Sequence, residues 1–131
     1  MMTTTQTLAQ FACALKQQPL SPEVIHHAKR AVIDWHAALL PGAVVAPSTL
    51  LEQALAEDLD RGQASLALGR AATTRTAALI NGTAAHTVEV DDIYRDAIYH
   101  PGAPTIAAAS SVSTRWYVQV LMNLPTHRPP V

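Results

Sequence analysis

The sequence is poor in several kinds of residue, and each shortage excludes a class of protein. Its single cysteine, Cys13, cannot form an internal disulfide, a zinc site of thiolates or an iron–sulfur site by itself. Nine basic residues stand against ten acidic ones, and the longest basic run is Lys29-Arg30. Because no basic field is present to hold a phosphate backbone, nucleic acid is not expected as a partner.

Long hydrophobic runs are also missing. No stretch approaches the roughly eighteen apolar residues of a membrane span. The amino terminus lacks the basic region that begins a signal peptide. The expected partners therefore include no membrane, and the lone cysteine favours a cytoplasmic location. With 131 residues, of which 49% are hydrophobic and 15% charged, the chain has the composition of one folded domain.

Helical periodicity is what the sequence does contain, and it predicts an all-α fold, a bundle of about five helices. The second helix is the best defined, because Ser21 is a typical N-cap, Pro22 suits the first helical position and Pro41-Gly42 ends the pattern. Trp35 and Phe11 fall on apolar faces and are expected in the core. The helices are predicted over residues 8–15, 22–42, 48–62, 75–90 and 104–111.

The fourth predicted helix is apolar around most of its circumference, so it belongs in a core. Asn81-Gly82 within it is also a typical two-residue hairpin turn. The flanking segments are rich in alanine and lack the alternation of strands, which favours a helix with a closely packed glycine. The segment 64–69, ASLALG, is too short to assign.

The composition changes abruptly after Ser111. The preceding part is rich in alanine, whereas residues 112–131 contain none and end in prolines. We therefore expect a helical unit over residues 1–111 and an atypical tail over 112–131 that does not pack as a further helix.

Acidic residues crowd directly after the fourth predicted helix, in the stretch EVDDIYRDAIYH. His86 and Glu89 are three residues apart and would share a helix face. A carboxylate at the carboxyl end of a buried helix is unfavourable unless something compensates its charge. Such positions are often functional, so this cluster is the candidate site.

His100 lies just before the fifth predicted helix. Pro101 favours an extended backbone at His100, and free amides at the helix start, near Gly102 and Ala103, suit a substrate carboxylate. An imidazole there could move a proton while neighbouring acids such as Asp91 hold it.

Simpler interpretations remain open. Asp91 and Asp92 are also what a solvated loop would carry, Arg95 could pair with Asp96, and His100 could be an ordinary turn histidine. A metal site from His86, Glu89, Asp91 or His100 has suitable ligand types but matches no established spacing, so none is predicted. Three further histidines are expected to be solvated or satisfied on a helix: His26, His27 and His36.

The segment AALINGTAAHTVEVDDIYRDAIYHPGAPTIAAAS resembles the amino-terminal signature of the MmgE/PrpD family, which includes 2-methylcitrate dehydratase and cis-aconitate decarboxylase. NGTAAH, DD and HPGAP occur in order, and the resemblance covers about Leu8 to Ser111. It implies an all-helical domain, joined in longer members to a smaller α+β domain and usually forming a homodimer. It also implies cofactor-free lyase chemistry on small polycarboxylates.

The resemblance implies roles for individual residues. The motif's acidic pair matches Asp91 and Asp92, and its histidine before Pro-Gly matches His100. Together with the cluster argued from the residues above, the candidate catalytic residues are Asp91, Glu89 and His100, and the candidate substrate-binding residues are Asp92, His86, Gly102 and Ala103. Glu89 and Ile93 replace an aspartate and a threonine of the decarboxylases, which weighs against cis-aconitate decarboxylation. Family members are several hundred residues long, so this chain resembles a truncated product that is inactive alone. The alternative is a non-catalytic helical fragment or association module, whose apolar fourth helix needs a partner.

Overall fold

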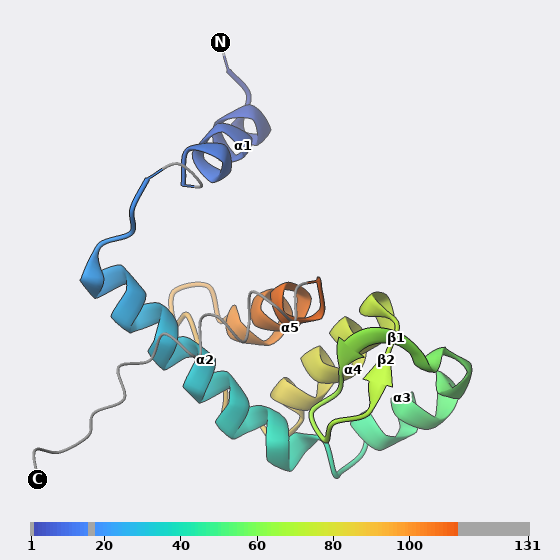
Figure 1. Ribbon diagram of the computed structural model, residues 1–131. Coiled ribbons are helices and arrows are strands. Elements are labelled where there is room, and N and C mark those ends of the chain that lie inside the picture. The colour runs from blue at the N-terminus through green and yellow to red at the C-terminus, as the bar shows by residue number, and fades with distance from the viewer. Residues whose placement is uncertain (1, 16–17, 113–131) are drawn as a thin grey trace, which may run out of the picture.

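The computed structural model describes residues 2–15 and 18–112, and it is mainly helical, with a small hairpin at one side (Figure 1). Helix α1 spans Thr4–Leu15 and α2 spans Pro22–Gly42. A short helix, α3, Ser48–Ala54, leads through a single 3-10 turn, η1, Ala56–Asp58, into strands β1, Leu59–Ser65, and β2, Ala71–Ala72. Helices α4, Thr74–Thr87, and α5, Gly102–Val112, complete the described part.

The two central helices both begin at a side-chain N-cap, and the cap at Ser21 is the one predicted above. The Ser21 hydroxyl accepts a hydrogen bond from the Val24 amide at 3.3 Å, with Pro22 as the first residue of α2. At the start of α4 the Thr73 hydroxyl accepts from the Thr76 amide at 3.4 Å. Each cap satisfies an amide that has no partner inside its helix, so these two helix starts are fixed locally.

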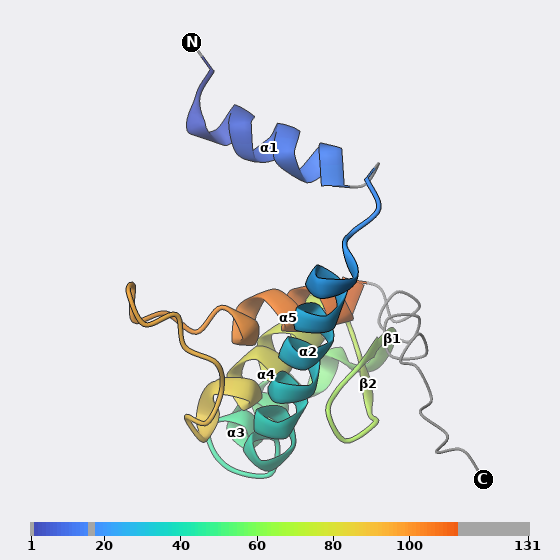
Figure 2. The ribbon, with the colours of Figure 1, turned by 90° about the vertical axis from the view of Figure 1, so that its left-hand side faces the viewer.

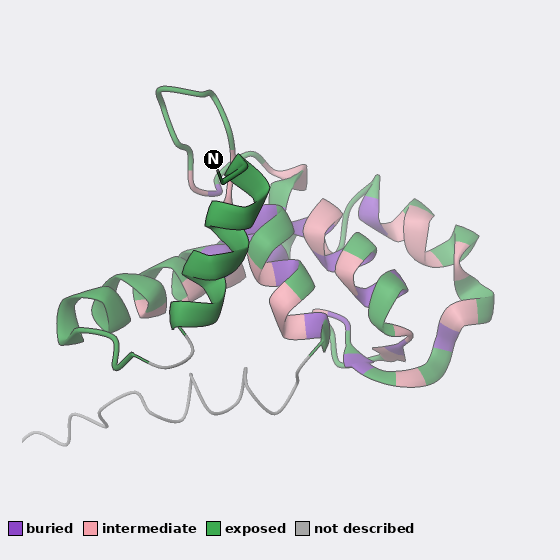
Figure 3. Ribbon diagram, turned by 90° about the horizontal axis from the view of Figure 1, so that it is seen from above, coloured by how far each residue is buried: buried purple, intermediate pink, exposed green. Residues whose placement is uncertain are grey.

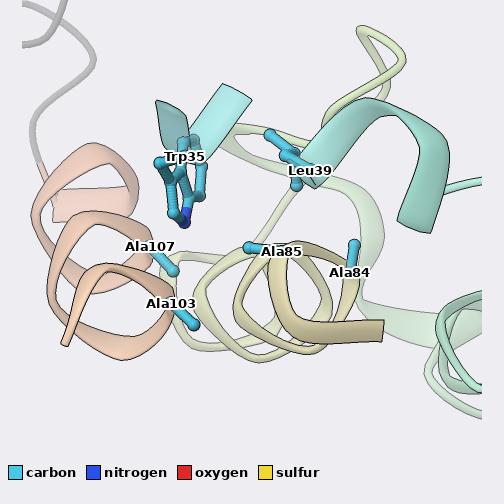
Figure 4. Packing of buried hydrophobic residues seen from close by; sticks show 6 residues of the cluster. All are labelled: Trp35, Leu39, Ala84, Ala85, Ala103 and Ala107. Atoms are coloured by element: carbon cyan, nitrogen blue, oxygen red, sulfur yellow. The ribbon is translucent and has the colours of Figure 1, made fainter. Parts of the chain in front are cut away.

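The main core forms where α2 crosses α4 and α5. Trp35 and Leu39 of α2 lie over alanines of α4 and α5, and all are buried (Figure 4). Small side chains let the backbones approach closely. At Gly42, an added Cβ would lie 1.8 Å from the Ala84 carbonyl oxygen, so α2 and α4 touch backbone to backbone there. Trp35 is therefore a core residue as predicted, and its buried Nε1 has no hydrogen-bond partner among the described residues.

The all-α prediction is wrong, because residues 59–72 form an antiparallel hairpin. Of the described residues 62% are helical and 10% are in strands, so the fold is mixed. Ser65 pairs with Ala71, and Ala72 faces both Ala64 and Leu59 across an irregularity in β1. The third helix correspondingly ends at Ala54 rather than near Gly62.

Burial against α4 explains why this segment forms strands. A second core cluster joins the hairpin to the helix and consists of Leu59, Ala64, Leu66, Ala72, Ala77 and Ile80. Asn81 adds polar anchors, because its Oδ1 accepts from the Ala67 amide at 3.1 Å and its Nδ2 donates to the Ser65 carbonyl at 2.9 Å. A long-range partner thus decides the structure of a segment whose own pattern is weak.

The helical prediction for Asn81-Gly82 is confirmed, since both residues lie within α4. A Cβ at Gly82 would be 3.5 Å from Ala107 Cβ, which is an ordinary contact, so close packing does not require this glycine. The fifth helix begins at Gly102, two residues before the predicted start.

Helix α1 stands apart from the other helices (Figure 2), and every one of its residues is exposed (Figure 3). Phe11, predicted in the core, is 62% exposed. Across residues 2–15 and 18–112, no helix combines the length and apolar character needed to cross a bilayer. Apart from Val112, the last residue of α5, the predicted tail lies outside the described residues.

Candidate active site

The site lies where α4 ends, along the loop of residues 88–101, and at the start of α5. After Thr87 the chain turns at Glu89, whose φ is 51°, and a bridge between Tyr94 and Tyr99 folds the loop back on itself. The folded loop projects away from the helices (Figure 2). It returns the chain to the end of α4, so that residues far along the loop lie beside His86.

Two histidines converge on one buried carboxylate. The Asp91 side chain is 0% exposed, and both of its oxygens lie 3.2 Å from His86 Nδ1. His100 Nδ1 lies 3.3 Å from Asp91 Oδ2. The two imidazole rings are 4.5 Å apart, centre to centre, and tilted by 55°. Residues from α4, the loop and the α5 approach therefore meet around Asp91.

The two histidines contact Asp91 differently. His86 Nδ1 lies at hydrogen-bonding distance and angle, whereas His100 Nδ1 is near enough for an ion pair but lacks hydrogen-bond geometry. His100 Nδ1 is buried and has no hydrogen-bond partner among the described residues. A wholly buried carboxylate needs compensating positive charge or donors, and these two imidazoles are the ion-pair partners recorded for it in the described chain.

Asp92 anchors the start of α5. Its carboxylate accepts the Gly102 amide, with Oδ1 at 3.0 Å and Oδ2 at 3.2 Å. A Cβ on Gly102 would lie 2.5 Å from Asp92 Oδ1, so the glycine makes room for this contact. The negative charge also suits a helix amino terminus. The Gly102 amide, expected to be free for a substrate carboxylate, is thus already bonded within the chain.

Glu89 does not join the cluster as predicted. Helix α4 ends at Thr87, so Glu89 shares no helix face with His86, and its side chain is exposed rather than buried. Within the described residues, the ligand atoms that gather within 4.8 Å of one another come from His86, Asp91 and His100. The three-residue spacing predicted that His86 would lie beside Glu89, whereas in the structure His86 contacts Asp91.

The other histidines fit the simpler interpretation. His26 and His27 are exposed on α2, and His36 lies 2.7 Å from the Val32 carbonyl through Nδ1.

A pocket of about 780 Å³ opens beside the cluster. His86, His100 and Ala103, the second residue of α5, form part of its wall. The remaining lining is mostly apolar, with Leu79, Gly82, Ile98, Tyr99 and Pro104 among its residues. The pocket thus combines an apolar surface with a few polar groups, as small-molecule sites commonly do.

Arg75 also lines this pocket, and sequence reasoning missed it. Arg75, Leu79, Gly82 and His86 follow one another at intervals of four, three and four, which places them on one helix face. The sequence alone shows this spacing, which could have identified Arg75 as sharing a helix face with His86. The guanidinium lies 3.7 Å from Asp58 and is largely exposed, so it supplies positive charge at the far end of the pocket from His86.

Among known families, the MmgE/PrpD N-terminal domain matches residues 6–118. The match includes the whole candidate site and extends beyond Ser111, where the motif resemblance ends. The family consists of dehydratase-like enzymes. No curated protein and no solved structure matches the chain.

Proposed function

This chain belongs to the MmgE/PrpD N-terminal domain family, and on that premise we propose that it is the amino-terminal part of a lyase acting on small polycarboxylates. The proposed reaction resembles that of 2-methylcitrate dehydratase, with transfer of a proton α to a carboxylate and loss of water. The observation that carries the proposal is the convergence of His86 and His100 on buried Asp91 at the wall of a pocket.

His100 is the proposed base. Because its Nδ1 faces Asp91, its Nε2 remains to accept the proton from the substrate carbon. The electron pair of the broken C–H bond forms the carbon–carbon double bond. The hydroxyl on the adjacent carbon leaves as water with the proton that His100 has taken up, so the imidazole returns to its neutral form. Buried Asp91 supports the cation formed on the imidazole. These steps use side chains alone and require no cofactor.

His86 lies beside His100, with the two ring centres 4.5 Å apart, and we assign it to substrate binding next to the departing hydroxyl. Arg75 would attract a substrate carboxylate into the pocket. Arg75 and His86 are eleven residues apart on α4, which is about 16 Å along the helix axis. Arg75 can therefore reach a small substrate at His86 only by extending its side chain along the pocket. Further cations would come from segments outside this chain, in a cytoplasmic homodimer.

The test of this assignment is His100→Ala in a longer family member carrying the same residues. We expect turnover of a citrate-like hydroxy acid to fall by roughly 10²–10⁴-fold, the usual contribution of a general base. The matched control is alanine in place of the histidine at the position of His27, which is exposed on α2. Circular dichroism would verify that both variants fold. Near-unchanged turnover by His100→Ala would refute the role of His100.

The alternative function, an association module, has support from a different helix than expected. Helix α4 is covered, since α2, α5 and the hairpin pack against it. Helix α1 instead exposes Leu8, Phe11 and Leu15. Sedimentation velocity at several concentrations would discriminate, because an association module should form larger species as concentration rises. A monomer at every concentration would argue against this alternative.

A further inference from the structure

We propose that His86, Asp91 and His100 form a binding site for a divalent transition-metal cation, with Zn²⁺ the best match. Two imidazole nitrogens and one carboxylate are ligand types that Zn²⁺ accepts. All three residues lie within a single segment of fifteen residues, from the end of α4 to the start of α5. The folded loop brings one ligand atom from each to within 4.8 Å of the others.

The separations suit a tetrahedral ion. Zinc–ligand bonds of about 2.0–2.1 Å place neighbouring ligands of a tetrahedron roughly 3.3 Å apart. Asp91 lies 3.2 Å from His86 Nδ1 and 3.3 Å from His100 Nδ1, so two edges already have the required length. The third edge, between the histidines, has to shorten from at most 4.8 Å. Because the His86 side chain is 48% exposed, its ring has room to rotate.

The charges also favour a cation. The Asp91 carboxylate is fully buried, and the two imidazoles balance its charge only when protonated. A dication would balance it without protons, and it would provide a partner for the buried His100 Nδ1, which makes no hydrogen bond among the described residues. With two nitrogen ligands the site favours Zn²⁺ over Mg²⁺ or Ca²⁺, which prefer oxygen ligands. The pocket leaves a fourth position open to water or a small anion.

Binding at this cluster would regulate the site, and this consequence rests on the proposed function. An ion on His86 and His100 would compete with the protons these residues exchange. Zinc would therefore inhibit a longer, active family member that carries the same cluster, and a chelator would restore its activity.

The experiment is a zinc titration of the 131-residue chain, by calorimetry and by competition with a zinc indicator, in a Cys13→Ser background that removes the exposed thiol. We expect one Zn²⁺ per chain, unaffected by excess Mg²⁺ and weakened as pH falls because protons compete for the ligands. His86→Ala and His100→Ala should each weaken binding by roughly ten-fold or more. His27→Ala is the matched control and should bind as the parent chain does.

Two results would overturn the proposal: no zinc binding by the parent chain, or equal affinity in the parent and both ligand variants. Circular dichroism identifies a variant that fails to fold. If His100→Ala unfolds, the zinc affinity of His86→Ala decides the outcome, because the His86 side chain is 48% exposed and its removal disturbs the fold less. The titration is independent of turnover, so a longer member that binds zinc but lacks lyase activity would refute the proposed function alone.

Discussion

Asp91 and Asp92 are adjacent in the sequence, yet their carboxylates contact different parts of the molecule. Asp91 is turned toward the pocket histidines, whereas Asp92 is turned toward the backbone at the start of α5. The first is suited to chemistry because its neighbours can gain and lose protons. The second fixes the position of α5, and through it the approach of His100 to Asp91.

Asp92→Ala should therefore destabilise the fold. Loss of the two contacts to the Gly102 amide resembles loss of a helix cap, which costs about 0.5–2 kcal/mol. Urea denaturation measures this free energy of unfolding. Asp96→Ala is the matched control, since Asp96 is an exposed acid of the same loop, and its effect should be close to zero. Equal stability of the two variants would contradict the anchoring role.

Gly42 and Gly82 should respond oppositely to alanine. At Gly42 the new methyl meets the Ala84 carbonyl, which is backbone and cannot move aside easily, so we expect a loss of roughly 1–3 kcal/mol or more. At Gly82 the methyl fits, and the helix interior gains about 0.5–1 kcal/mol from the better helix former. Thermal unfolding of both variants provides the comparison. A tolerated Gly42→Ala would show that α2 and α4 are not in backbone contact.

At the scale of elements, the sequence predicts what local chemistry decides. Ser21 and Thr73 cap helices through amides three residues away, so both helix starts could be predicted. The hairpin depends on Asn81, which bonds to Ser65 sixteen positions earlier, and no local pattern contains that contact. The pairing of His86 with Asp91 needs the turn at Glu89, a positive-φ residue that sequence reasoning treated as helical.

The hairpin also has an external ion pair that can be tested. Hydrogen bonds from the Arg70 guanidinium, the nearest at 2.8 Å, hold the pKa of Asp60 below its usual value. A lowered pKa contributes stability above the ordinary pKa of an aspartate, and this contribution is lost as pH falls through the folded value. Because both groups are exposed, the effect on overall stability at neutral pH should be small.

Arg70→Gln should raise the pKa of Asp60 toward its ordinary value, as measured by NMR titration of the Asp60 carboxyl carbon. Arg61→Gln is the matched control, because Arg61 is an exposed cation next to Asp60 in β1. The pKa should change more in the first variant than in the second. The reverse order would mean that Arg70 is not the main partner of Asp60 in solution.

At the scale of the whole molecule, the described residues provide part of the proposed lyase site. The pocket has a proposed base, a carboxylate that supports it and one arginine, but its wall consists largely of apolar side chains. A polyanionic substrate needs more positive charge than Arg75 supplies, together with a cover that excludes water. We therefore expect catalysis to depend on groups outside this chain.

The most direct measurement is an assay of the purified 131-residue chain for hydration, dehydration and decarboxylation of citrate-like acids, beside a longer family member that carries the same cluster. The prediction is turnover by the longer member, its loss on His100→Ala, and no appreciable turnover by this chain, because removing members of a catalytic unit abolishes most of the rate. Turnover by this chain comparable to that of the longer member would contradict the proposal that catalysis depends on groups outside this chain.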